Sequence, residues 1–146
     1  MAKVFEKSLF FRMGVGFMRR SIVFGLAPKG AHLLSVADQE SGALHTTPVT
    51  VIENDDGRWL VAAYGVSRWV RDARAAGWVE LRRGRRKERL RIAEVGAQEG
   101  APILRQYVQA VATVRPYFDV DADAPVEAFV DEIERHPVFR ITGPAS

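Results

Sequence analysis

A short loop of small residues, followed by two arginines, is the stretch of this sequence best suited to chemistry. The loop is Gly65-Val66-Ser67, and Arg68 and Arg71 follow it. A small-residue loop that leads into a helix presents backbone N–H groups at the positive end of the helix dipole, and this arrangement binds anions, most often phosphate. The same residues also fit a plain strand-to-helix connection with a solvated basic face, because Gly-x-Ser has little specificity on its own.

The residues around the loop predict the elements that hold it in place. Residues 59–64 are an apolar run of strand length, and the predicted strand spans 58–64 after a turn sequence at 54–57. Ser67 is a helix N-cap residue type, and Gly77 stands where a C-cap glycine belongs, so a helix is expected between them. The predicted apolar face of this helix comprises Trp69, Val70 and Ala73, and its predicted polar face comprises Arg68, Arg71 and Asp72.

The remaining pattern predicts an antiparallel sheet with inserted helices. Further strands are expected at residues 31–37, 44–53, 78–82, 87–95 and 138–142. Pro48 interrupts the second of these, so that part should be an edge, a bulge or a strand start. Pro116 is expected to end a helix over 98–115, and Pro125 to begin another. Their predicted apolar stripes are Leu104, Tyr107, Val108 and Val111 in the first helix, and Val126, Phe129, Val130 and Ile133 in the second.

Hairpins dominate this order of elements, which indicates an α+β protein built on a small antiparallel barrel with covering helices. The 146 residues suit one domain with a sizeable core. We divide the chain into an amphipathic helix and linker at residues 1–28 and a barrel domain at 29–146. The absence of cysteine excludes disulfides, thiolate metal sites and cysteine nucleophiles. The three histidines form no metal-ligand pattern, so no metal site is predicted.

Charge and hydropathy suggest where the protein works. The net charge of +3 and the pI near 9.6 favour anionic partners. No secretory signal is recognisable, and no uncharged run reaches the ~18 residues of a spanning helix, so a cytoplasmic protein is expected. Residues 3–20 have the pattern of a basic amphipathic helix, which predicts peripheral membrane contact through residues 3–26. The alternative is that this apolar stripe packs on its own domain.

The densest positive charge lies between residues 82 and 91. Seven residues make up this run: Arg82, Arg83, Arg85, Arg86, Lys87, Arg89 and Arg91. It surrounds a predicted hairpin turn, Glu80 and Glu88 are interleaved with it, and no recognition helix or RNA-binding signature accompanies it. A solvated hairpin is therefore favoured over a nucleic-acid partner. Contact with an acidic cofactor tail or a membrane surface is a second use.

Four segments, taken in order, resemble the deazaflavin-dependent nitroreductase family. They are Ser41-Gly42 with Thr46-Thr47-Pro48-Val49, then residues 61–65 with 69–77, then residues 114–120, and finally residues 136–140. Together they spread over roughly residues 30 to 142. The resemblance implies the split β-barrel that flavin and deazaflavin reductases share.

The resemblance also implies a cofactor and a reaction. The coenzyme would be F420, a deazaflavin that carries a phosphate and an oligoglutamate tail, with FMN as the runner-up. It would deliver hydride to a small-molecule electron acceptor such as a quinone, a nitro compound or an activated double bond. The implied cofactor-binding residues are Ser41, His45, Thr46, Thr47, Pro48, Ala63, Tyr64, Gly65, Ser67, Arg68, Trp69 and Arg71. Tyr117 is the implied catalytic residue, as a proton or hydrogen-bond donor when hydride arrives.

The sequence departs from the family pattern at three places. Gln39-Glu40 replaces a basic pair, His45 replaces an arginine, and Tyr64 stands where a small residue is usual. A carboxylate at Glu40 would repel a phosphate by roughly 1 kcal/mol. The resemblance over the four segments still makes a deazaflavin-dependent reductase the leading hypothesis, and a homodimer is one assembly open to it. The alternative is a cofactor-poor family member that binds a lipid or another apolar ligand and associates with membranes.

Overall fold

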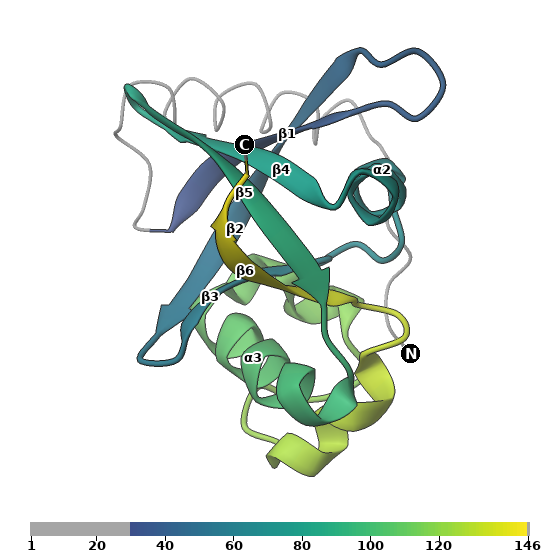
Figure 1. Ribbon diagram of the computed structural model, residues 1–146. Helices are drawn as coiled ribbons and strands as arrows, with labels where there is room; N and C mark the ends of the chain where they lie inside the picture. Colours follow the sequence, from purple (N-terminus) through teal and green to yellow (C-terminus); the bar gives the residue numbers. More distant parts are fainter. Residues whose placement is uncertain (1–29, 146) are drawn as a thin grey trace.

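The computed structural model describes residues 30–145, in which six strands form a closed antiparallel barrel in the order β1-β2-β3-β6-β5-β4 (Figure 1). The strands are β1 (Ala31–Ala37), β2 (Leu44–Asn54), β3 (Gly57–Val61), β4 (Trp78–Arg83), β5 (Arg86–Glu94) and β6 (Val138–Pro144). The helices are α2 (Arg68–Ala76) and α3 (Ala97–Ala110), and the 3₁₀ helices are η1 (Ala112–Tyr117) and η2 (Val126–Glu132). The predicted fold class is confirmed. The helix predicted at residues 3–20 lies outside the described residues.

The strands follow the sequence pattern closely, with one shortened end. Pro48 pairs with Leu33 of β1, while the pairing of β2 with β3 begins only at Val51, so Pro48 lies in an edge segment as expected. Strand β3 ends at Val61 rather than at residue 64. The chain leaves the ladder there because the Ala62 N–H donates to the carbonyl of Pro137 and Gly65 turns the backbone with φ of 90°.

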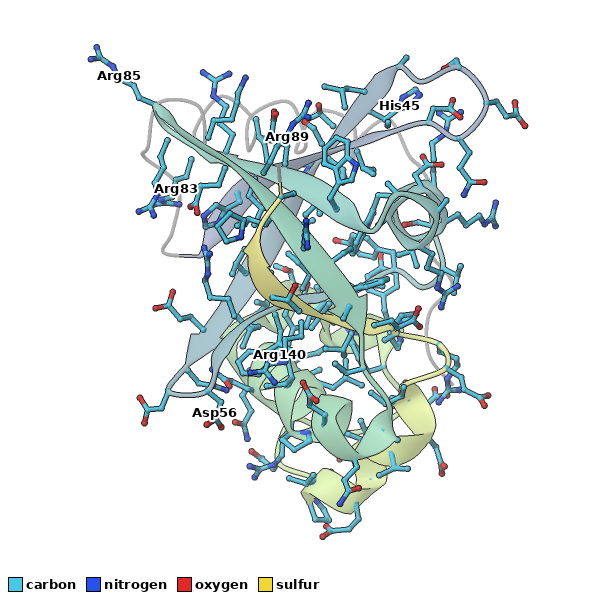
Figure 2. The ribbon with its side chains drawn as sticks, in the orientation of Figure 1. His45, Asp56, Arg83, Arg85, Arg89 and Arg140 are labelled. Atoms are coloured by element: carbon cyan, nitrogen blue, oxygen red, sulfur yellow. The ribbon has the colours of Figure 1, made fainter. Side chains whose placement is uncertain are left out.

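The basic run lies on the β4–β5 hairpin, as the sequence predicts. Arg83 pairs with Arg86 across a two-residue turn, and Arg85 projects from its tip (Figure 2). The neighbouring acids neutralise part of this charge, since Arg86 lies 3.0 Å from Glu88. The guanidinium of Arg89 also stacks over the Trp78 ring at 4.5 Å. Part of the positive charge of the hairpin is therefore engaged in contacts with other side chains of the same hairpin.

Two hydrophobic cores position the elements. The first fills the barrel and is closed at one end by α2, with Val70 and Ala73 packed on Leu34, Leu60 and Phe139. The second lies between the sheet and the helical layer seen below the barrel in Figure 1. Its principal members are Ile52, Trp59, Val61, Leu104, Tyr107, Val108 and Phe129. The α2 helix thus sits over the barrel end, apart from the larger helical layer.

The helix predicted over residues 98–115 ends earlier than expected, so the prediction is wrong for residues 111–115. Helix α3 ends at Ala110, and residues 112–117 form the 3₁₀ helix η1, which contains Pro116. Proline lacks an N–H and its ring conflicts with the carbonyl four residues earlier, so it disfavours α-helix before it. The Arg115 side chain then donates to the carbonyls of Val108 and Gln109 at 3.0 and 3.1 Å, which satisfies the open end of α3.

The apolar stripe predicted after Pro125 is also wrong in part. Residues 126–132 form the 3₁₀ helix η2, in which three residues complete a turn. Phe129 and Glu132 therefore face inward at a spacing of three, and Val130 is 42% exposed. The α-helical spacing assumed in the sequence analysis would place Val130 in the interior.

Candidate functional site

Helix α2 has the predicted termini, but its N-cap residue makes no side-chain hydrogen bond to the first turn. Ser67 occupies the N-cap position in extended conformation, yet its hydroxyl makes no capping hydrogen bond. Gly77 ends the helix in the left-handed region, with φ of 77°, and its N–H donates to the Ala73 carbonyl at 2.8 Å. Because Ser67 leaves the first turn of α2 without a side-chain cap, its backbone N–H groups can serve an external anion.

The β1–β2 turn, which carries Ser41, is fastened to α2. The Gln39 amide donates to the Arg71 carbonyl at 2.7 Å, and the Gln39 backbone N–H points at Asp72 Oδ1 at 3.4 Å. Asp72 is only 5% exposed, so its predicted place on the polar face is wrong. The turn covers that part of the helix, which local periodicity could not reveal. Glu40, whose carboxylate was expected to repel a phosphate, lies exposed in the turn.

An aspartate that the sequence analysis did not single out, Asp38, is the centre of this contact. Asp38 Oδ2 lies 3.3 Å from His45 Nε2 and 3.7 Å from the Arg68 guanidinium. Its Oδ1 accepts the Glu40 N–H at 2.9 Å. That backbone hydrogen bond, helped by His45 and Arg68, lowers the pKa of Asp38, so the group is a carboxylate. Two predicted binding residues therefore meet around an internal anion.

The other β2 residues do not all join this cluster. The Thr46 hydroxyl bonds Ser35 Oγ at 2.7 Å, and alternation along the strand puts Thr46 on the opposite face from His45 and Thr47. Ser41 Oγ accepts the Ala43 N–H at 3.2 Å in the exposed turn. Figure 2 places His45 at the α2 side of the barrel, with Arg83 and Arg85 on the far side. The predicted β2 donors are thus divided between two faces.

Arg71 is the predicted cation most available to a ligand. It is exposed, and its guanidinium makes no ion pair within residues 30–145. Trp69, one residue after Arg68, instead packs against the barrel core, where its ring lies 5.8 Å from that of Phe139. Of the cluster on α2, the arginines face outward and the tryptophan anchors the helix.

A pair of tyrosines forms a second part of the site. The rings of Tyr64 and Tyr117 meet edge to face with centroids 5.0 Å apart, so the loop before α2 and the end of η1 are brought together. Tyr64 is 39% exposed, while Ala63 before it is buried. Burial raises the pKa of Tyr64, and Tyr117 adds to the shift. Tyr107 is buried as expected, and burial raises its pKa as well. The Tyr64 and Tyr107 phenols are therefore neutral at physiological pH.

A buried histidine that the sequence analysis did not single out joins the same two segments. His136 Nδ1 lies 2.9 Å from the Ala62 carbonyl oxygen, and Nε2 lies 2.9 Å from that of Tyr117. The ring of Phe118 stacks on it at 3.9 Å. The only sequence signal was its place in the last family-like segment, which says nothing about its contacts.

Two further features bear on the class of site. Within the part of the chain that the structure describes, no three His, Asp or Glu side chains gather in a way that could hold a metal ion. Over the same range, the chain has no helix with the length and hydropathy needed to cross a membrane.

Solved structures similar to this one share its fold. A protein of unknown function from Agrobacterium tumefaciens, Atu2129, aligns at a TM-score of 0.58 and 15% identity, over 89% of this chain and 55% of that one. An F420-H2 dependent reductase, FDR-A, aligns at 0.53 and 17%, over 77% and 94%. A pyridoxamine 5′-phosphate oxidase-related, FMN binding protein from Nostoc punctiforme aligns at 0.53 and 11%, over 97% and 83%. Another match, at 0.57 and 15% over 91% and 97%, is described as a domain-swapped dimer.

At these identities the structural likeness establishes the fold alone, which is the split barrel of flavin- and F420-binding proteins. No curated protein matches the chain. The sequence model of one family, described as F420H(2)-dependent quinone reductase, matches residues 11–132. This match spans most of the 146 residues and agrees with the resemblance drawn from the four segments. The chain therefore belongs to the F420H(2)-dependent quinone reductase family.

Proposed function

We propose that this protein is an F420H2-dependent oxidoreductase that transfers hydride to a quinone, with nitro compounds and activated double bonds as further acceptors. The observation that carries the proposal is the docking of the β1–β2 turn on α2. This contact gathers His45, Arg68 and Arg71 at the uncapped N-terminus of one helix. The family match supports F420 as the coenzyme.

The residues at this helix end fit the phosphate of such a coenzyme. The first turn of α2 offers N–H groups without a side-chain cap, and Arg71 is exposed with no ion pair among residues 30–145. Arg68 would contribute once it exchanged Asp38 for the phosphate, because a 3.7 Å contact at an exposed arginine is weak. Gly65 and Ser67 add backbone and hydroxyl groups beside them.

The placement of these residues suggests separate roles for the coenzyme and for the protein. When bound, the reduced deazaflavin would supply the hydride, and the protein would orient it and shape the acceptor pocket. The ring of Tyr117 contacts the ring of Tyr64, and Tyr64 belongs to the segment that leads into α2. Its phenol would hold a hydrogen bond to the acceptor or give it a proton as charge develops there. Trp69 would act indirectly, by anchoring α2 on the barrel core.

A fluorescence titration with F420 tests the binding site. Arg71→Ala and Arg68→Ala should each weaken binding about tenfold or more, since a hydrogen bond to a charged group contributes about 1.5–3 kcal/mol. Arg85→Ala is the matched control, because Arg85 carries the same charge at the far hairpin tip (Figure 2). Binding that is lost equally in all three variants would reflect net charge alone and would reject this site. The same assay with FMN tests the alternative cofactor, which a flavin-binding neighbour makes reasonable.

A second candidate function is the binding of a lipid or another apolar ligand without the coenzyme. Asp38 favours it, because this carboxylate already pairs with Arg68 and contacts the His45 ring. Mass spectrometry of material extracted from the purified protein separates the two candidates. Fatty acid without deazaflavin would support the second, and co-purified deazaflavin would support the first.

Two proposals concern assembly and location. We infer a homodimer, supported by the domain-swapped dimer among the structural neighbours, and sedimentation equilibrium would reject it if only monomer were found. Peripheral membrane contact through residues 3–26 is a proposal from sequence only. It would be rejected if deletion of these residues left co-sedimentation with anionic vesicles unchanged.

A further inference from the structure

We propose that His136 is a doubly protonated imidazolium and that, with Glu132 as its counter-ion, it clamps the Tyr117 segment to the Ala62 segment. The geometry at the ring carries this inference. Nδ1 and Nε2 each lie 2.9 Å from a backbone carbonyl oxygen, of Ala62 and of Tyr117. A carbonyl oxygen can only accept a hydrogen bond, so both ring nitrogens must donate. Only the imidazolium carries two N–H groups.

The charges around the ring support the same protonation state. Glu132 is 1% exposed, and its Oε2 has no hydrogen-bond partner but lies 3.6 Å from His136 Nε2. Its Oε1 accepts from the Asp119 N–H at 3.0 Å and from Arg135 at 2.8 Å. Arg135 also pairs with Asp119 at 2.6 Å. With His136 protonated, this cluster holds two positive and two negative groups and is balanced. With a neutral ring it would carry an excess negative charge beside a buried carboxylate.

Packing keeps the arrangement away from water. His136 is 4% exposed, and Phe118 stacks on its ring with an interplanar angle of 18°. A neutral ring in this place would direct a bare nitrogen lone pair at a carbonyl oxygen, and little solvent reaches the site to relieve that contact. The charged groups of this cluster come from two places in the chain: Glu132, which lies beside the ring, and Arg135 from η2 and the residues after it, and Asp119 from the loop after η1.

The clamp joins the two segments that carry the tyrosine pair. Ala62 lies two residues before Tyr64, and the Tyr117 carbonyl belongs to the residue whose ring meets Tyr64 at 5.0 Å. His136 is therefore a positioning residue that acts through the backbone of both segments. Its role in the reaction rests on the proposed function, whereas its protonation state and its clamp do not.

Nitrogen NMR of the imidazole side chains tests the protonation state directly. In the full-length ¹⁵N-labelled protein at pH 7, both ring nitrogens of His136 should be protonated and have similar chemical shifts. The chain has three histidines, so His32→Gln and His45→Gln assign the third set of signals by elimination. One protonated and one bare nitrogen on His136 would overturn the proposal. This measurement needs neither coenzyme nor activity, so failure of the reductase hypothesis and failure of the clamp can be told apart.

The counter-ion is tested by Glu132→Gln, with Glu134→Gln as the matched control at an exposed neighbouring position. Loss of the carboxylate should change the chemical shifts of both His136 ring nitrogens, because an opposite charge within ~4–6 Å favours the charged form of the ring. The ring signals of Tyr64 and Tyr117 should shift in Glu132→Gln and stay unchanged in the control. Equal effects in both variants would overturn the clamp. If Glu132→Gln did not fold, the wild-type NMR measurement would still decide.

Discussion

At the scale of single residues, Asp38 most changes the binding site that the sequence predicted. Its carboxylate holds His45 and Arg68, two residues that were expected to face a phosphate. Removal of this internal anion should make the Arg68 guanidinium and the His45 ring more available to an anionic coenzyme. Asp38→Asn is therefore expected to tighten F420 binding about two- to fivefold, a range typical of exposed ion pairs.

The matched control for that titration is Asp55→Asn, which removes one negative charge from an exposed turn away from α2. The deazaflavin nucleoside without its phosphate serves as a second control, and its affinity should not change in Asp38→Asn. Weaker binding of F420 by Asp38→Asn would contradict the competition, and would instead make Asp38 a support for the site.

The same residue predicts a dependence of stability on pH. The folded protein lowers the pKa of Asp38, chiefly through the Glu40 N–H, so the carboxylate stabilises the fold above its unfolded pKa. That contribution is lost as the pH falls below about 4 and the group becomes protonated. Urea unfolding should therefore separate wild type from Asp38→Asn at pH 7, and the separation should shrink at pH 3. A gap that widened at pH 3 would contradict this sign.

Tyr117 gives a kinetic prediction at the same scale. Tyr117→Phe keeps the ring that packs against Tyr64 but removes the phenol O–H. If this group assists proton transfer, kcat with a quinone should fall about 100-fold while coenzyme affinity is preserved. Steady-state kinetics and the F420 titration measure the two quantities. An unchanged kcat would assign Tyr117 a packing role only.

At the scale of elements, the stability of α2 depends on how it ends. Gly77 has φ of 77°, and a Cβ built on it meets nothing within 4 Å. Gly77→Ala should therefore destabilise the protein by about 1 kcal/mol through backbone strain alone. Chemical unfolding measures the loss, with Gly77→Asn as control, because asparagine adopts the left-handed region more readily than alanine. Equal losses in both variants would show that strain at Gly77 is not the cause.

At the scale of the whole molecule, burial of side chains in both hydrophobic cores stabilises the fold. Leu60 is fully buried in the barrel, so Leu60→Ala should cost about 2–5 kcal/mol. Val130 was expected in the second core but is exposed on η2, so Val130→Ala should stay within about 0.5 kcal/mol. Urea unfolding of both variants checks the assignment. A large loss at Val130 would mean that this side chain is buried in solution, by a second copy of the chain for example.

Local rules predicted much of this architecture from the sequence. The strand at residues 31–37 has the expected limits, the edge position of Pro48 follows from its missing N–H, and Gly77 adopts the left-handed conformation expected at a C-cap. Four family-like segments pointed to the same family as the sequence model. Each of these features is determined by a few adjacent residues or by a short motif, so it can be predicted from the sequence alone.

Contacts between distant residues depend on how the whole chain packs. Asp72 is buried because a turn from 33 residues earlier covers it, and Ala62 and His136 are joined across 74 residues by closure of the barrel. Glu132 faces inward because η2 is a 3₁₀ helix packed against that same region. Periodicity and turn chemistry carry no information about such distant contacts, because burial and hydrogen bonding there are set by the joint packing of all the strands. The sequence therefore determined the fold family and the candidate arginines, while the packed barrel decided that Asp38 would hold one of them and that His136 would join the tyrosines.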